Sequence, residues 1–280
     1  MAIPEVIRDL LENGVHFGHL SKHWNPKMKR FIFGKKKNIY IIDLEKTAQK
    51  LAEAKDFVKG IAEEGQKILF VATKRQLRDL IKNEAHLCGM PYVAERWVGG
   101  FLTNFSTIRA RVTRYITLLE RRKSGGFDKI PRKEVVRLNR EIERMEKNYS
   151  GVTSLEDLPG CVFVVDPKKE VACVREANKL GIPIAALIDT DADPGAIDYP
   201  IPGNDDAIKS VRYITSCMSE AIREGLKRHG KTIEEEKEEV KEEESDGAKY
   251  EEMASPAVEK EEKEEKEVRK RRGQRKGETV

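Results

Sequence analysis

Three continuous apolar runs constrain the fold of this chain more than any other feature. They are KILFVATK (67–74), CVFVVDP (161–167) and IPIAALIDT (182–190), and KNIYIIDL (37–44) is a plausible fourth. Runs that are apolar at nearly every position, not at every second one, are typical of strands buried on both faces of a parallel sheet. The sequence therefore predicts a sheet that is covered on both sides.

Helical patterns alternate with these runs, at 45–64, 75–88, 169–180 and 204–228. Such alternation predicts right-handed crossovers and an α/β fold: a three-layer sandwich with a parallel, Rossmann- or flavodoxin-like sheet. Gly181 fits the end of one helix, directly before a strand. The first residues, MAIPEVIRDLLENG, predict an amphipathic helix and lack the features of a secretory signal.

The middle of the chain breaks the alternation. Two highly charged segments, 106–122 and 131–149, carry apolar residues at a spacing of three or four, which predicts an inserted antiparallel coiled-coil hairpin. The predicted apolar positions are Ile108, Val112, Tyr115 and Leu119 in the first segment and Val135, Leu138, Ile142, Met145 and Tyr149 in the second. We therefore expect a discontinuous α/β domain (1–105 and 150–230) and a projecting hairpin (106–149).

Charge is distributed unevenly along the chain. The last 50 residues hold 13 Lys and Arg against 18 Asp and Glu, which leaves 40 basic and 31 acidic residues, or +9, in residues 1–230. We expect the charged extension 231–280 to be disordered, with a basic end able to contact RNA or a protein. The basic remainder favours a polyanionic ligand. The four scattered cysteines fit a reducing cytoplasm, and no apolar run is long enough for a membrane helix.

Residues 14–45 combine three histidines with a dense group of basic residues. Lysine and arginine neutralise phosphates, and aromatic rings stack on unpaired bases or brace a loop. The alternative is a solvated basic surface over core aromatics. The predicted RNA contacts in this basic segment are Lys22, His23, Trp24, Asn25, Lys27, Lys29, Arg30, Lys35, Lys36 and Lys37, interleaved with Phe31 and Phe33.

Two further segments are candidates for RNA contact. Lys74 and Arg75 follow a predicted strand, where a helix N-terminus would favour a phosphate. The segment ERWVGGFLTNFSTIR (95–109) contributes Arg96, Trp97, Asn104 and Arg109. A purely structural elbow between the core and the hairpin is an equally good interpretation of that second segment.

Catalysis has little support in the sequence. The chain has no P-loop, no GxGxxG fingerprint, no GxSxG elbow and no CxxC pair. A divalent-metal site made by His16 and His19 with Asp189, Asp191, Asp193 and Asp198 is the minority hypothesis; the main one is that the histidines are scaffold. We thus predict no catalytic residue, no metal, no cofactor, no small-molecule substrate and no membrane partner. Two rival functions stay open, a phosphate-binding α/β enzyme and a protein-interaction adaptor that needs no RNA.

Several long motifs occur in order from about Ile7 to Lys227. They include GVHFGH, WNPKMKRFIFG, ILFVATKRQ, ERWVGGFLTNF, FDKIPRKE, EANKLGIPIAALIDTDADP and IPGNDDAIKS. Together they resemble the bacterial small-subunit ribosomal protein family conventionally numbered two. The long acidic-then-basic extension departs from many bacterial members.

The resemblance implies a non-enzymatic, cytoplasmic component of the small ribosomal subunit at its head–body junction. It implies contact with small-subunit ribosomal RNA during translation. It also implies neighbouring ribosomal proteins as partners, among them the large protein numbered one, which captures messenger RNA. The basic segment, the turn at Lys74 and Arg75, and residues 96–109 match family segments expected to approach RNA.

Overall fold

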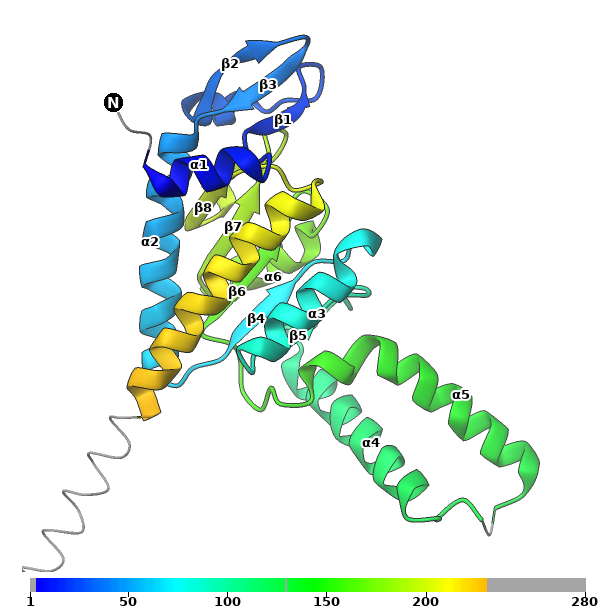
Figure 1. Cartoon of the computed structure of the whole chain (residues 1–280). Helices are drawn as coiled ribbons and strands as arrows, with labels where there is room; N and C mark the ends of the chain where they lie inside the picture. Colours follow the sequence, from blue (N-terminus) through cyan, green and yellow to red (C-terminus); the bar gives the residue numbers. More distant parts are fainter. Residues whose placement is uncertain (1–3, 129, 231–280) are drawn as a thin grey trace, which may run out of the picture. The chain divides into compact units, whose positions relative to one another are not determined.

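The computed structural model describes residues 4–128 and 130–230, so the predicted extension 231–280 lies outside the described residues. The chain forms a mixed α/β fold around a five-stranded parallel sheet (Figure 1). Its strands are β4 (Ile68–Val71), β5 (Tyr92–Val93), β6 (Cys161–Val165), β7 (Ile184–Ile188) and β8 (Tyr199–Pro202). The order across the sheet is β5-β4-β6-β7-β8, and every neighbouring pair is parallel. Numbered within the sheet this is 2-1-3-4-5, the flavodoxin-like order.

The helices of the α/β body follow the predicted alternation. They are α1 (Glu5–Glu12), α2 (Leu44–Glu63), α3 (Arg78–Leu87), α6 (Val171–Leu180) and a last helix at 208–230. Gly181 ends α6 in the left-handed conformation (φ +68°), as its sequence position predicted. Short 3₁₀ turns occur at Pro26–Phe31, Arg75–Leu77, Ser150–Val152 and Pro194–Ala196.

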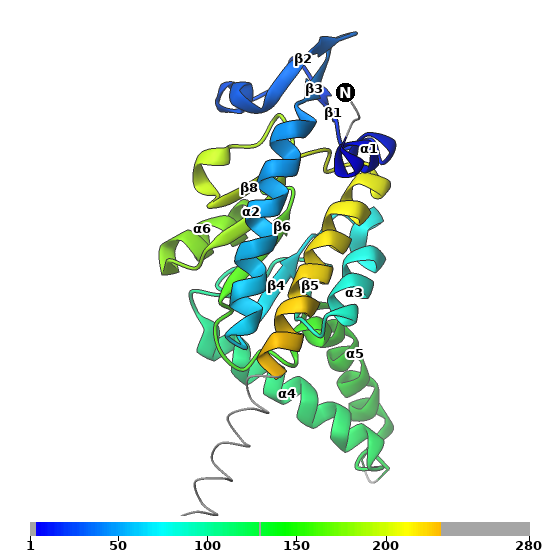
Figure 2. The ribbon, with the colours of Figure 1, turned by 60° about the vertical axis from the view of Figure 1, so that its left-hand side comes forward.

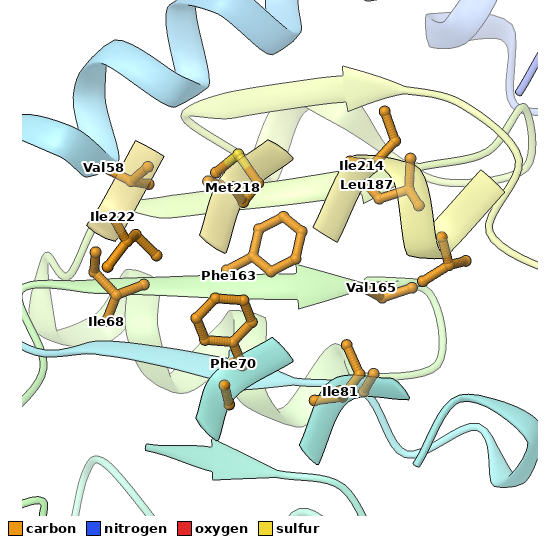
Figure 3. Packing of buried hydrophobic residues seen from close by; sticks show 14 of the residues in the cluster. Val58, Ile68, Phe70, Ile81, Phe163, Val165, Leu187, Ile214, Met218 and Ile222 are labelled. Atoms are coloured by element: carbon orange, nitrogen blue, oxygen red, sulfur yellow. The ribbon is translucent and has the colours of Figure 1, made fainter. Parts of the chain in front are cut away.

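Both faces of the sheet are buried, as the continuous apolar runs predicted. Along β4, Ile68 and Phe70 point into one buried cluster, whereas Leu69 and Val71 belong to the other. The first cluster packs under α2, α3 and the last helix, which lie side by side in Figure 2. In its centre the Phe70 and Phe163 rings meet edge to face at 5.4 Å (Figure 3).

The predicted strand at 37–44 is real, but it does not belong to the parallel sheet. It forms β3 (Ile39–Ile42), which pairs antiparallel with β1 (Phe17–Leu20) and β2 (Ile32–Lys36) in a separate small sheet. Asn38 and Lys37 adopt positive φ between β2 and β3, which makes a tight two-residue turn. Lys35 pairs with Tyr40 across this turn, so β2 and β3 form a hairpin and need no crossover helix.

The predicted helices of the middle segment form α4 (Phe105–Lys123) and α5 (Arg132–Tyr149), which pack against each other. Ile108, Val112 and Tyr115 are buried, as predicted, but the next fully buried position is Leu118, and Leu119 is only half-buried. The pair joins the body beside β5, since the 3₁₀ turn after α5 contacts that strand.

Two helical glycines offer a matched test of this packing. An added Cβ at Gly225 in the last helix would collide with the backbone oxygen of Lys59 in α2, whereas a Cβ at Gly60 meets nothing within 4 Å. We expect Gly225→Ala to lower the free energy of unfolding by about 1–3 kcal/mol through overpacking. Gly60→Ala should raise it by about 0.5–1 kcal/mol because alanine is the better helix former. Denaturant unfolding measures both, and equal effects of the two substitutions would contradict the described helix contact.

Candidate nucleic-acid interface

The basic segment is displayed by a short 3₁₀ turn whose apolar residues are its anchors. In Pro26–Phe31, Met28 and Phe31 are buried, so the intervening Lys29 and Arg30 point to solvent. The turn begins at Asn25, whose side chain accepts a hydrogen bond from the Lys27 backbone N–H at 3.0 Å. Burying two anchors fixes the directions in which the charged side chains leave the surface.

Most of the predicted contacts in this segment are exposed: Lys22, His23, Lys27, Lys29, Arg30, Lys35, Lys36 and Lys37. Trp24 is half-buried and packs on Tyr40 with ring centroids 5.0 Å apart, and Asn25 is half-buried as the cap. Lys27 makes an ion pair with Asp193 at 2.7 Å. The structure therefore leaves these cations exposed along one stretch of the chain, with Trp24 packed on Tyr40.

This segment is attached to the carboxyl end of β7. The Asn25 backbone N–H donates to the Thr190 carbonyl at 2.8 Å, and the His19 N–H donates to Thr190 Oγ1 at 2.9 Å. The His19 ring Nδ1 lies 2.9 Å from Asp189 Oδ2, and Nε2 lies 3.4 Å from Asp206 Oδ2. His19 thus joins β1 of the small sheet to two loops of the body.

A buried ion cluster occupies the carboxyl edge of the large sheet, at the switch point between β4 and β6. The Lys74 ammonium lies 2.9 Å from Asp166, 2.8 Å from Asp205 and 2.8 Å from Asp206. Asp205 is fully buried, and the Lys74 side chain is 15% exposed. Lys74 is therefore surrounded by carboxylates.

The cluster raises the pKa values of its two cations, His19 and Lys74, and also that of the buried Asp205 carboxyl group. The hydrogen bond to Asp189, opposed by burial and aided by nearby carboxylates, raises the pKa of His19 to about 9. Burial lowers the pKa of Lys74, but Asp205, Asp206 and Asp166 outweigh it and raise it overall. Burial next to Asp166 raises the pKa of Asp205 to about 7, despite its bond to Lys74. Both cations therefore stay charged at neutral pH.

This arrangement disfavours the predicted phosphate contact of Lys74. Its ammonium group already contacts three carboxyl groups, and an incoming phosphate would meet Asp166, Asp205 and Asp206. Arg75, by contrast, is exposed at the start of the following turn. The switch point, where open α/β sheets commonly bind ligands, is filled here by the protein's own charges.

The hypothetical His/Asp metal group comes together only in part. His19 lies with Asp189 and Asp191 and, on its other side, with Asp205 and Asp206; each set has ligand atoms within 4.8 Å of one another. His16 is in neither set; its ring lies tilted against Phe17 with ring centroids 4.0 Å apart, and Asp193 pairs with Lys27. Asp198 instead accepts the Ile184 N–H. A cation bound by Asp205 and Asp206 would have to displace the Lys74 ammonium.

The segment 95–109 is organised by a carboxylate that the sequence did not point to. Glu176 of α6 accepts hydrogen bonds from the Trp97 indole N–H at 3.0 Å and from the backbone N–H groups of Gly100 and Leu102 at 2.8 and 2.9 Å. Burial would raise the pKa of Glu176, but these bonds outweigh it and lower the pKa. These bonds support the elbow interpretation of the turn before α4.

The predicted contacts in this segment are not brought together on one surface. Trp97 is 8% exposed and packs on Phe101, so its ring belongs to the core and does not present a face to a base. Arg109 is half-buried and donates to the Leu155 carbonyl at 3.1 Å. Arg96 and Asn104 are exposed.

Asp205, Asp206, Glu170 and Glu176 are the structural residues that the sequence analysis missed. Glu170 is buried and accepts the Thr73 N–H at 3.1 Å, 97 residues away in the chain. No local spacing indicates such a partner. Asp205 and Asp206 fall at the start of the predicted helix 204–228, but the observed helix begins at residue 208, so both lie in the loop before it.

The raised pKa of His19 makes stability depend on pH. Its pKa is about 9 in the folded chain against an ordinary 6.5, so the stabilisation is complete below pH 6.5 and is lost as the pH rises through 9. We expect the free energy of unfolding to fall by roughly 1–3 kcal/mol between pH 6.5 and 9. His19→Gln should remove most of this fall, whereas the exposed control His23→Gln should keep it. Chemical denaturation at several pH values gives the answer, and identical profiles for all three proteins would contradict the ion-paired role of His19.

The chain can now be compared with known proteins. None of the helices in the described ranges is long and apolar enough to cross a membrane. A family model described as ribosomal protein S2 matches residues 10–225. Small ribosomal subunit protein uS2 of Coprothermobacter proteolyticus is 52% identical over 219 residues, 78% of this chain and 82% of the relative. The protein of the same name from Dictyoglomus turgidum is 52% identical over 220 residues, 79% of this chain and 89% of the relative. The matched region contains the parallel sheet, the basic segment and the α4–α5 pair, and the chain belongs to the ribosomal protein S2 family.

Proposed function

We propose that this chain is a structural component of the small ribosomal subunit that binds small-subunit ribosomal RNA, near the head–body junction, in the cytoplasm. The observation that carries the proposal is the exposed basic segment on a braced 3₁₀ turn and small sheet. Family membership and relatives named as small ribosomal subunit proteins support it. They also agree with a non-enzymatic role.

The proposed RNA contacts are the exposed members of the predicted set. In the basic segment these are Lys22, His23, Lys27, Lys29, Arg30, Lys35, Lys36 and Lys37; outside it, they are Arg75, Arg96 and Asn104. We assign supporting roles to Trp24, Asn25, Lys74, Trp97 and Arg109, because each is half-buried or buried against the protein.

The binding mode follows from the chemistry of these groups. Flexible lysines contact phosphates as point charges, so affinity would come mainly from counterion release and fall steeply with salt. Sequence discrimination would come from RNA shape, since phosphate contacts carry no base information. The division into an α/β domain and a coiled-coil hairpin belongs to the same proposal, with the hairpin as a second contact region.

Removing four lysines from the basic segment tests this proposal. We expect Lys22→Gln, Lys29→Gln, Lys35→Gln and Lys36→Gln together to weaken binding to small subunits depleted of this protein by about 10²–10³-fold near 100 mM salt. The slope of log affinity against log salt should flatten by about 3. The measurement is a titration of labelled protein at several salt concentrations.

A matched control removes the same charge elsewhere. Lys209, Arg212, Arg223 and Lys227 lie exposed in the last helix, and changing all four to Gln leaves the total charge equal to that of the test variant. We refer to this quadruple variant as the helix control, and we expect it to bind like the unaltered chain. Equal losses for both variants would mean that only net charge matters, and no effect of either would oppose the basic segment as the contact.

We propose a second function, recruitment of the large messenger-RNA-binding protein numbered one, on the ground of an exposed apolar surface at Phe33, within the basic segment. Phe33 on β2 is 80% exposed, and Leu11 and Phe17 are 48% and 47% exposed. Beside Phe33 is a hollow of about 310 Å³ that is also lined by Leu11, Ile41 and Asp43. A large exposed aromatic beside an apolar hollow is typical of a protein interface. The acidic lining at Asp43 and Glu45 disfavours a phosphate there.

Phe33 has a useful control in Leu87, another strongly exposed apolar side chain (61%) at the end of α3. We expect Phe33→Ala to weaken binding of the protein numbered one by about tenfold or more, as for an aromatic hot spot. Leu87→Ala should have no effect, and neither substitution should unfold the chain, because both side chains are exposed. Pull-down with purified protein one measures the effect, and undiminished binding by Phe33→Ala would remove this surface from the proposal.

A further inference from the structure

The α4–α5 pair is attached to the body by two connections that are held in different ways. We call them the entry turn, residues 94–104 between β5 and α4, and the exit turn, residues 150–160 between α5 and β6. The exit turn packs closely on β5, because a Cβ at Gly151 would collide with the Tyr92 carbonyl oxygen. Close backbone packing therefore fixes the exit turn to the edge of the large sheet.

The entry turn is less constrained by its own residues. Gly99 is exposed, and a Cβ there would meet nothing within 4 Å. Gly100 has φ +81°, a conformation that glycine adopts more readily than other residues. Asn104, the residue before α4, makes no side-chain cap hydrogen bond to the helix. Two successive glycines before such a helix start make the entry turn the more pliable of the two connections.

One carboxylate of the body binds the entry turn along most of its length. Glu176 in α6 accepts five hydrogen bonds from donors that lie 73–79 residues away in the chain. Oε1 accepts the Trp97 indole N–H and the Gly100 N–H. Oε2 accepts the Leu102 N–H at 2.9 Å, and both the N–H and the hydroxyl of Thr103 at 3.2 Å. A single side chain thus connects the turn before α4 to a helix of the body.

These bonds are directional, whereas the apolar contacts at the same place are not. Phe101 and Leu102 bury their side chains in the core beneath the turn. The hydrophobic effect has no preferred direction, so this burial holds the turn on the body without fixing its angle. Hydrogen bonds weaken steeply when their angle departs from linearity. The angle of the entry turn is therefore set mainly by the bonds to Glu176.

The orientation of the pair is sensitive to contacts at its base. The loop between α4 and α5 lies at the end of the pair that is remote from the five-stranded sheet (Figures 1 and 2). The 19 residues of α4 span about 28 Å, so a rotation of roughly 10° at the base would move the far end by about 5 Å. Small changes in the entry turn are thus amplified along the helices.

We propose that Glu176 is a positioning residue: its carboxylate fixes the angle of the α4–α5 pair on the body, and without it the pair rotates about the exit turn. The proposal goes beyond the proposed function, because it concerns the free chain before any partner is bound. A pair that is already held at one angle loses less conformational freedom when a partner contacts both the pair and the body.

The test replaces the carboxylate by an amide of the same shape. In Glu176→Gln one oxygen becomes an NH₂ group, which cannot accept from the N–H donors that face it. Glu84→Gln is the matched control, because Glu84 is a half-buried glutamate of α3 whose carboxylate accepts the Ser219 hydroxyl of the last helix at 2.7 Å. Thermal melts verify that both variants fold.

Pulsed electron spin resonance then measures the angle of the pair through one distance. Spin labels are placed at Ser124→Cys, at the end of α4, and at Asp56→Cys in α2, because both positions are exposed. Three of the four native cysteines are buried, and the half-buried Cys217 is replaced by Ala in every sample. We expect one narrow distance distribution for the unaltered chain and for Glu84→Gln. In Glu176→Gln the distribution should broaden or shift by about 5 Å, as for a rotation of roughly 10°.

Amide hydrogen exchange reports on the bonds themselves. The N–H groups of Gly100, Leu102 and Thr103 should exchange about 10–100-fold faster in Glu176→Gln, since each loses its acceptor. Faster exchange with an unchanged distance distribution would overturn the proposal, because the bonds would then order only the turn. Equal broadening in Glu84→Gln would also overturn it, because any loss of stability would then move the pair.

A milder variant decides the question if Glu176→Gln does not fold. Trp97→Phe keeps an aromatic ring in the core beside Phe101 and removes one of the five donors. We expect it to broaden the same distance distribution, by less than the loss of all five bonds would. An unchanged distribution in every variant that folds would contradict the positioning role of Glu176.

Discussion

The contact of Lys74 with Asp166, Asp205 and Asp206 is the interaction on which the functional surface depends. It lies where β4 and β6 diverge, and it binds the turn after β4 to the loop after β8. Asp206 also faces His19, and His19 is bonded to Asp189 after β7. Four loops from the carboxyl edge are thus held in one network of charges, and the small sheet is attached through it.

This network also explains why a Rossmann-like sheet can be a scaffold instead of a small-molecule site. Parallel sheets with the strand order 2-1-3-4-5 commonly bind ligands at the switch point between their first and third strands. They use a glycine-rich turn and a free helix N-terminus there. Here the same place holds side chains of both signs in direct contact, with Asp205 inside the protein. Exposed cations lie outside it, on the 3₁₀ turn and the small sheet. The anion binding proposed above would thus use these appended elements and not the edge of the large sheet.

Sequence reasoning predicted what local patterns determine. Continuous apolar runs at 67–74, 161–167 and 182–190 identified three strands, and the 3/4 spacing identified α4 and α5. It missed β5 and β8: the first is two residues long, and the second contains Pro200 and Pro202, which are unusual in a strand. It placed β3 in the wrong sheet, because Ile39–Ile42 resembles a central parallel strand and only the turn at Lys37 and Asn38 shows that it pairs locally.

For the candidate site, the basic segment could be predicted from its composition alone. The ion pairs of Lys74 could not, because its partners lie more than 90 residues away in the chain.

The positions of the small sheet and the helix pair on the large sheet have a kinetic consequence. The small sheet is bound to the loops after β7 and β8, and the α4–α5 pair joins the body beside β5, the edge strand opposite β8. If both regions contact RNA as proposed, the sheet between them would keep the second contact at a high effective concentration once the first has formed. Release would then require both contacts to break within the same short interval. Two individually weak, salt-sensitive contacts would in this way give a residence time far longer than either alone.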